Sequence, residues 1–227
     1  MQQTETEPPP PPAAAARRAA ALAAACLNYR RGGPSRGLAL RALAAAAAAQ
    51  DIDNVGRKYH LKLVLEDILE KDNIVNCTAE VLYHLVNKNA APDVHLTIEG
   101  ELKNTDEQDN IFYNRIKSLK KELVAQNIPD SHGNVSPEME PIRLLAHVAS
   151  GYVVWQNSTE NTRYELAQIK DVKQVKRSDE YLEFDYMVLL HEFVSQEIIP
   201  WQMTVLWHPQ HGVKVTQNSR QPKHAEY

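Results

Sequence analysis

The sequence has little of what enzymes and disulfide-rich proteins contain. Only two cysteines, Cys26 and Cys77, occur in 227 residues. They cannot form a disulfide framework and neither belongs to a C-x-x-C motif, so we expect both to be small buried apolar side chains. Glycine is also scarce, with eight residues in the chain. No glycine-rich phosphate-binding loop, G-x-S-x-G or H-E-x-x-H motif is present, so the sequence offers no catalytic constellation.

Long apolar runs and a strong excess of one charge are missing as well. No run of about 18 apolar residues occurs, the length that a membrane-spanning helix needs, so no membrane span is expected. The formal net charge is -4, which argues against nucleic acid as a partner. The first residues lack the basic start and continuous apolar run of a secretory signal.

The N-terminal fifty residues have a composition of their own. Residues 1–12 are rich in proline and polar residues, which predicts a disordered tail. Residues 13–31 are dominated by Ala, Leu and Arg and are followed by Gly32-Gly33-Pro34, which predicts a helix with a strong stop. A second alanine run covers residues 44–49. Because alanine favours helix, any strand here would have to be imposed by pairing with other strands.

From Tyr59 onward, apolar and polar residues alternate. This pattern is typical of an antiparallel sheet that is covered on one face. The connections between the alternating runs are short, as hairpins require. The apolar positions of the three runs are Tyr59, Leu61, Leu63 and Leu65; Val75, Cys77, Ala79, Val81 and Tyr83; and Val94, Leu96 and Ile98.

A helical pattern covers Thr105–Val124. Phe112, Ile116, Leu119 and Leu123 recur at helical spacing, cap oxygens precede them, and lysines gather toward the C-terminal end. This segment stands between two sheet-forming halves, so we predict a connecting helix.

The second half repeats the order of one helix and then strands. An apolar stripe predicts a helix over residues 138–156. A first strand over residues 164–176 loses its alternation between Leu166 and Ile169, which indicates a bulge. The next three strands have apolar positions Leu182, Phe184, Tyr186, Val188 and Leu190; Trp201, Met203, Val205 and Trp207; and Val213 and Val215. We therefore predict an α+β fold with two subdomains, each a helix packed on a twisted four-stranded antiparallel sheet.

The segment His191–Trp201 is unusual for a connection between strands. It is too long for a tight hairpin, and Pro200 is expected to limit pairing at its end. It combines apolar Phe193, Val194, Ile198 and Ile199 with polar His191, Ser195, Gln196 and Glu197. A semi-rigid loop of this kind suits insertion into the cleft of another protein. The alternative is that a strand continues through it and packs in the core.

Two histidines near the C-terminus, His208 and His211, lie three residues apart. No third ligand of suitable spacing joins them, so a surface turn explains them better than a metal site. We expect no metal and no cofactor in this chain.

Several separated blocks of the sequence resemble the latexin family. The resemblance covers about residues 57–223. The matching blocks are Asn76–Tyr83, Gln126–Asp130, Gly133–Met139, Gly151–Tyr152 with Trp155–Glu160, and Ser195–Met203 with Val205–Gln210.

The resemblance implies two cystatin-like subdomains and an inhibitory activity. The expected division is an N-terminal subdomain over 13–103, a connecting helical segment over 104–128, a C-terminal subdomain over 129–217, and a tail over 218–227. The resemblance further implies a cytoplasmic, monomeric protein that reversibly inhibits zinc-dependent metallocarboxypeptidases of the A/B type. It would do so by covering the active-site funnel with the subdomain junction and the segment singled out above.

The resemblance also implies which residues touch the protease. The residues that match His191 and Gln196 belong to the contact surface in this family, and Glu192, Ser195 and Glu197 are included because they are adjacent. The zinc would belong to the enzyme. Two alternatives stay open. One is a scaffold or matrix protein without a protease target. The other is a cystatin-type inhibitor of cysteine proteases, although no Q-x-V-x-G motif occurs in the sequence.

Overall fold

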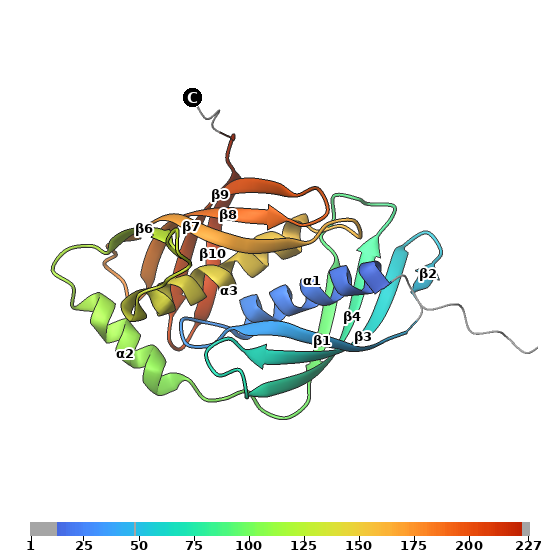
Figure 1. The fold of residues 1–227 in the computed structure, drawn as a ribbon, viewed down its shortest axis with the longest axis horizontal. Helices are drawn as coiled ribbons and strands as arrows, with labels where there is room; N and C mark the ends of the chain where they lie inside the picture. The colour runs from blue at the N-terminus through green and yellow to red at the C-terminus, as the bar shows by residue number, and fades with distance from the viewer. Residues whose placement is uncertain (1–12, 48, 224–227) are drawn as a thin grey trace, which may run out of the picture.

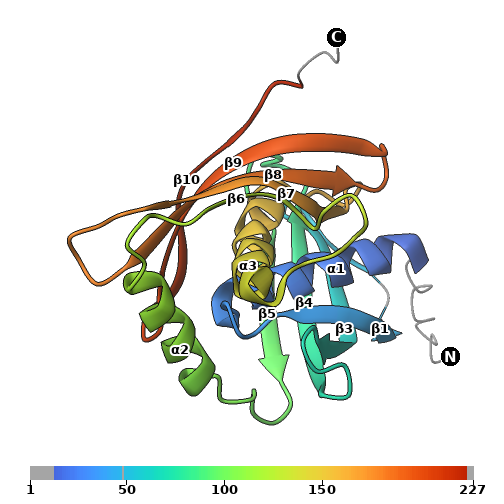
Figure 2. The same ribbon diagram turned by 60° about the vertical axis from the view of Figure 1, so that its left-hand side comes forward.

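Two helices lie between two antiparallel sheets, which confirms the predicted α+β class (Figures 1 and 2). The computed structural model describes residues 13–47 and 49–223. The predicted disordered tail, residues 1–12, lies outside the described residues, as do the last four residues of the predicted C-terminal tail. The division into domains that the sequence suggests stays a prediction.

The first unit packs α1 on a sheet with the strand order β1-β3-β4-β5, in which β2 also pairs with β3. The helix spans Ala13–Arg31, as the sequence predicts. The strands are β1 (Leu38–Ala46), β2 (Gln50–Ile52), β3 (Gly56–Asp67), β4 (Ile74–His84) and β5 (Asp93–Ile98).

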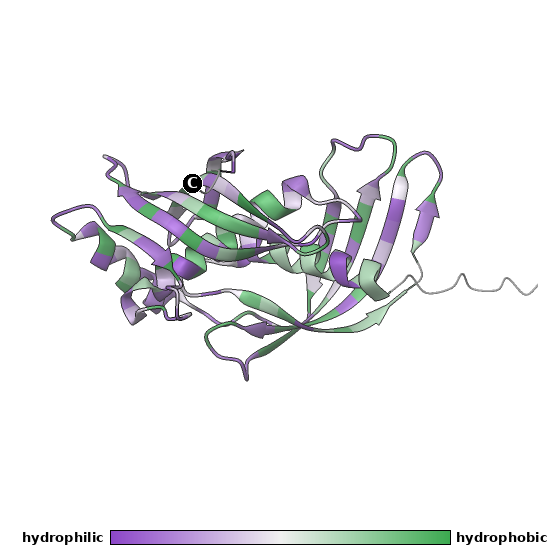
Figure 3. Ribbon diagram, turned by 45° about the horizontal axis from the view of Figure 1, so that its top comes forward, coloured by the Kyte–Doolittle hydropathy of each residue, from purple (hydrophilic) through white to green (hydrophobic). Residues whose placement is uncertain are grey.

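The second unit packs α3, Glu140–Asn157, on a sheet with the order β10-β9-β8-β7-β6. A short 3-10 helix, Pro137–Met139, leads into α3, and the helix α2, Asp106–Lys117, connects the two units. The strands are β6 (Val124–Ile128), β7 (Tyr164–Val175), β8 (Leu182–Glu192), β9 (Glu197–His208) and β10 (Gly212–Arg220). Bands of polar and apolar residues alternate along the strands (Figure 3).

Each sheet has five strands where the sequence predicts four. The additional strands are β2 and β6, which are short and carry no clear alternation. The break in alternation along β7 is a bulge, as predicted, because the register with β8 shifts between Leu166 and Gln168 and again between Ile169 and Asp171.

The predicted connecting helix is too long at its C-terminal end. It ends at Lys117, and the chain is strand by Val124. Leu123 is buried because it joins the sheet: its N–H donates to the Gln174 side chain and its carbonyl accepts the Gln174 N–H. The helical spacing of Leu123 is therefore a coincidence, and pairing with β7 determines its conformation.

The alanine-rich strand β1 is held by its partner. It pairs antiparallel with β3, and its register shifts between Leu40 and Ala42 and again between Leu43 and Ala45. Of its residues only Leu38 is fully buried. The pairing with β3 therefore imposes this strand on a sequence whose local preference is helical, as expected.

The alanines of α1 let two helices approach closely. A Cβ atom on Gly151 of α3 would lie 2.2 Å from the carbonyl oxygen of Ala25 in α1. At this separation a carbon atom cannot fit, so residue 151 can carry only a hydrogen atom in place of a side chain. The buried residues of α1 are mostly small: Ala16, Ala19, Ala20, Leu22, Ala23, Ala24, Cys26, Leu27 and Asn28. The small side chains therefore place α1 in contact with both α3 and its own sheet.

Both cysteines are buried and free, as predicted. Burial raises the pKa of Cys26 to about 12 and that of Cys77 to about 11. Both thiols are therefore protonated at neutral pH, which makes them unreactive core side chains.

Substituting Gly151→Ala should destabilise the fold, because the added methyl group cannot fit against the Ala25 carbonyl. We expect a loss of about 1–3 kcal/mol in the free energy of unfolding, measured by chemical denaturation. Gly33→Ala is the matched control, since its Cβ would lie 3.5 Å from Trp207 Nε1, an ordinary contact. Equal effects of the two substitutions would contradict the close-packing argument.

Candidate functional site

The segment His191–Trp201 is a short hairpin and not the long loop that the sequence predicts. Strand β8 continues through Glu192 and β9 begins at Glu197, with His191 opposite Ile198 and Glu192 opposite Glu197. Only Phe193–Gln196 join the two strands. We call these four residues the hairpin tip. The prediction of a long loop is wrong because both strands extend further than their alternating cores indicate.

Pro200 lies within β9, opposite Leu189, and does not end the pairing. Its carbonyl accepts the N–H of Gln221, beyond the end of β10 at Arg220. In an antiparallel strand the N–H and C=O of one residue point to the same side. The missing N–H of Pro200 would therefore point toward Gln221 and away from β8. The proline thus costs no hydrogen bond between β8 and β9.

The apolar residues of the hairpin are mainly exposed. Phe193 is 36% exposed, Val194 57% and Ile198 44%, whereas Ile199 is buried. The alternative prediction, that a strand continues through the segment and packs in the core, holds for the two strands on either side of the tip and for the side chains of Ile199 and Trp201. The tip presents apolar surface to solvent.

Glu192 is buried beneath the tip and anchors it. Its carboxylate accepts backbone N–H groups from Arg163 at 2.9 Å, Val194 at 3.0 Å and Ser195 at 2.6 Å. Burial by itself would raise the pKa of Glu192, but hydrogen bonds from Ser195, Arg163 and Val194 outweigh it and lower the pKa to about 2. Glu192 is therefore a charged anchor that fixes the backbone of the tip.

The side chains of Gln196 and His191 close the tip from the other side. Gln196 has a positive φ of 61°, and its Nε2 donates to the Phe193 carbonyl at 2.6 Å. Its Oε1 lies 3.2 Å from His191 Nε2, a hydrogen bond that requires this nitrogen to carry the proton. The His191 ring also lies 4.2 Å from the Phe193 ring, centroid to centroid. Both residues are thus ordered at the surface before any partner binds.

Sequence reasoning missed Arg163, which supports the base of the tip. Its guanidinium carbon lies 5.3 Å from the centroid of the Phe193 ring, and its carbonyl accepts the Phe193 N–H at 2.8 Å. Arg163 lies 29 residues from Glu192 in the chain, and no local pattern marks it. Only the pairing of β7 with β8 brings it here.

The five predicted contact residues all lie on this hairpin, but they face different ways. His191, Ser195 and Gln196 lie at or beside the tip. Glu192 points inward, as described above. Glu197 is exposed and lies 3.4 Å from Arg220 and 3.5 Å from Lys223, so it faces the C-terminal segment.

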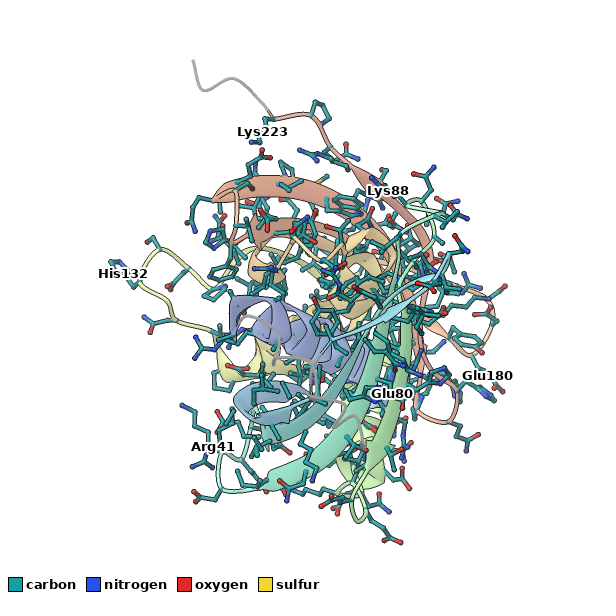
Figure 4. The ribbon with its side chains drawn as sticks, turned by 90° about the vertical axis from the view of Figure 1, so that its right-hand side faces the viewer. Arg41, Glu80, Lys88, His132, Glu180 and Lys223 are labelled. Carbon is teal, nitrogen blue, oxygen red and sulfur yellow. The ribbon has the colours of Figure 1, made fainter. Side chains whose placement is uncertain are left out.

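The rings of the two C-terminal histidines lie 4.7 Å apart, centroid to centroid, but the two residues differ in burial. His208 is buried, with its ring 5.6 Å from those of both Tyr113 and Tyr181, so the prediction of a surface turn is wrong for it. Its Nδ1 accepts the N–H of Gln210. His211 is exposed, as predicted. Glu180, beside His208, and His132, after β6, project from opposite sides of the molecule (Figure 4). In residues 13–47 and 49–223, no group of three or more His, Cys, Asp or Glu side chains is arranged to hold a metal ion.

The chain is similar to known proteins over most of its length. The sequence model of the family described as Latexin matches residues 9–225. The chain belongs to the latexin family. It is 54% identical to mouse Latexin over 88% of this chain and 90% of the relative, and 54% identical to human Latexin over the same shares. It is 36% identical to chicken Ovocalyxin-32 over 83% of this chain and 68% of that protein.

As a latexin-family member, the chain is not an enzyme. This conclusion rests on the family relation and not on a missing motif. Among the helices that the structure describes, none is both long enough and apolar enough to span a membrane.

The charge on Glu192 should make hairpin stability depend on pH. Its folded-state pKa of about 2 lies below its usual value of 4.5, so its stabilisation is complete above about pH 4.5 and is lost as the pH falls toward 2. Glu192→Gln should cost about 1–3 kcal/mol in unfolding free energy at neutral pH, and the difference from the parent should vanish across that window.

Denaturant titrations of parent and variant at a series of pH values measure this difference. Glu197→Gln is the control, because it removes the same charge from an exposed position on the same hairpin. We expect it to change the free energy of unfolding little at any pH. A difference between parent and Glu192→Gln that is independent of pH would contradict the role of the carboxylate.

Proposed function

We propose that this latexin-family chain inhibits zinc-dependent metallocarboxypeptidases of the A/B type by reversibly covering their active-site funnel. The contact surface is the hairpin tip, which includes Ser195 and Gln196, with His191 and the exposed Glu197 beside it, together with the subdomain junction. Glu192 supports the tip from below. The chain acts as a cytoplasmic monomer and needs no cofactor of its own, since the zinc belongs to the enzyme.

The observation that carries the proposal is an exposed tip whose shape is fixed before binding. Glu192 holds three backbone N–H groups, and Gln196 holds the Phe193 carbonyl. A preorganised loop loses little conformational entropy on binding, and this loss commonly limits affinity. The tip therefore has the property that an inhibitor needs in order to enter a narrow opening.

The composition of the tip also suits a protein interface. Phe193, Val194 and Ile198 offer apolar area, and His191 and Gln196 offer hydrogen-bonding groups beside it. Interfaces combine an apolar centre with a few oriented polar groups, and a few residues carry most of the affinity. Stable complexes bury about 1,600 Å² in total. Four tip residues supply only part of this area, so the proposal includes the junction as a second contact.

Replacing the polar side chains of Gln196, in the tip, and His191, beside it, should weaken inhibition. We expect His191→Ala and Gln196→Ala each to raise the inhibition constant against carboxypeptidase A at least about tenfold, as for anchoring residues of an interface. The free energy of unfolding should change little, because both side chains lie at the surface. Enzyme titration and denaturation measure the two quantities.

The chain provides matched controls at the opposite end of β9. His211→Ala and Gln210→Ala make the same chemical changes at exposed positions, and both variants should inhibit like the parent. Unchanged inhibition by the two tip variants would rule out the proposed contact surface. A parallel titration of papain tests the cystatin-type alternative, and inhibition of neither enzyme would favour the scaffold alternative.

A further inference from the structure

The loop between α3 and β7, residues 158–163, joins the hairpin tip to the N-terminal unit. Its Glu160 carboxylate accepts a hydrogen bond from the Tyr59 hydroxyl at 2.8 Å and lies 3.3 Å from the Arg57 guanidinium. Its backbone carbonyl accepts a hydrogen bond from Arg18. Tyr59 and Arg57 belong to β3 and Arg18 to α1, so one residue of the C-terminal half is held by two elements of the N-terminal half.

This loop is tied within itself as well. The Thr159 N–H donates to Thr162 Oγ1 at 2.9 Å, and the Asn161 N–H donates to Thr159 Oγ1 at 3.2 Å. Arg163 comes next, and its N–H and C=O bind Glu192 and Phe193 at the base of the tip. Only two residues, both within a hydrogen-bonded turn, separate Glu160 from Arg163. Glu160 is thus connected to the tip through a short, hydrogen-bonded stretch of backbone.

The environment of Glu160 strengthens its contacts. Its side chain is 17% exposed, and Tyr59 is buried. Burial and the neighbouring Glu160 carboxylate raise the pKa of Tyr59 to about 12, so the hydroxyl keeps the proton that it donates. Charge-assisted hydrogen bonds are stronger away from water than at a fully exposed surface. Arg57 also pairs with exposed Asp51, which orients its guanidinium without competing for Glu160.

We infer that Glu160 is a positioning residue that fixes the hairpin tip relative to the N-terminal half of the molecule. The inference rests on the proposed function, because a contact surface made of tip and junction fits one enzyme only if these parts keep a fixed separation. Glu160 itself touches no partner in this account. It acts through Arg163 on Glu192 and Phe193.

The test compares Glu160→Gln with Glu183→Gln. Both substitutions remove one charge from a side chain that is paired with an arginine, and the two side chains are 17% and 16% exposed. Glu183 lies at the start of β8, whereas the tip follows its end. We expect Glu160→Gln to weaken inhibition of carboxypeptidase A about tenfold, the loss typical of hydrogen bonds to a charged group, and Glu183→Gln to leave it unchanged.

A second measurement separates positioning from a general loss of stability. The Glu160→Gln effect on the inhibition constant should shrink when Gln196→Ala is already present, because the tip then no longer contributes fully. A purely structural role would give the same effect in both backgrounds and would overturn the inference.

Amide hydrogen exchange tests the link without the enzyme. Exchange at Val194 and Ser195 should be faster in Glu160→Gln than in the parent and in Glu183→Gln. Unchanged exchange together with unchanged inhibition would overturn the positioning role. Faster exchange in a chain whose parent form does not inhibit would keep the Glu160 link and reject the proposed function, so the two failures are distinguishable.

Discussion

The close contact between α1 and α3 is the constraint on which the rest of the molecule depends. Each helix covers the inner face of one sheet, and their contact joins two helix-on-sheet units into one body (Figure 2). The approach is possible because Gly151 faces the Ala25 carbonyl and because α1 is lined with alanine. The alanines of α1 thus have a structural reason: larger side chains would separate the helices and the sheets they carry.

The hairpin tip is held in this arrangement by two carboxylates, that of Glu192, which is buried, and that of Glu160, which is partly buried. Glu192 fixes the local shape of the tip by accepting backbone N–H groups, and Glu160 fixes the place of the preceding loop against α1 and β3. Glu192 acts within the second helix-on-sheet unit, and Glu160 joins that unit to the first. Both carboxylates have hydrogen-bonding partners, which is the condition under which such a group can leave water without a large penalty. In the proposed function, these two carboxylates contribute by keeping the tip rigid, and they do not react themselves.

Short-range patterns made most of the fold predictable. Alanine content and the glycine stop marked the helix over 13–31, and alternation marked the longer strands. The short strands β2 and β6 were missed, because pairing with a neighbour determines them and their own sequences do not. For the same reason the hairpin could be located from its composition, but its length could not. Nothing local identified Glu160 or Arg163, because the contacts that matter here, with Tyr59 and with Glu192, join residues 29 or more positions apart.

The most direct test of this account is hydrogen exchange of the parent chain alone and in the presence of carboxypeptidase A. We predict new protection at the hairpin tip and at the adjoining loop of residues 158–163, with exchange in the turn between β9 and β10 unchanged. That turn lies at the other end of β9 and serves as the internal reference. Protection that is absent from the tip, or that appears only in the distant turn, would contradict the claim that this hairpin meets the enzyme.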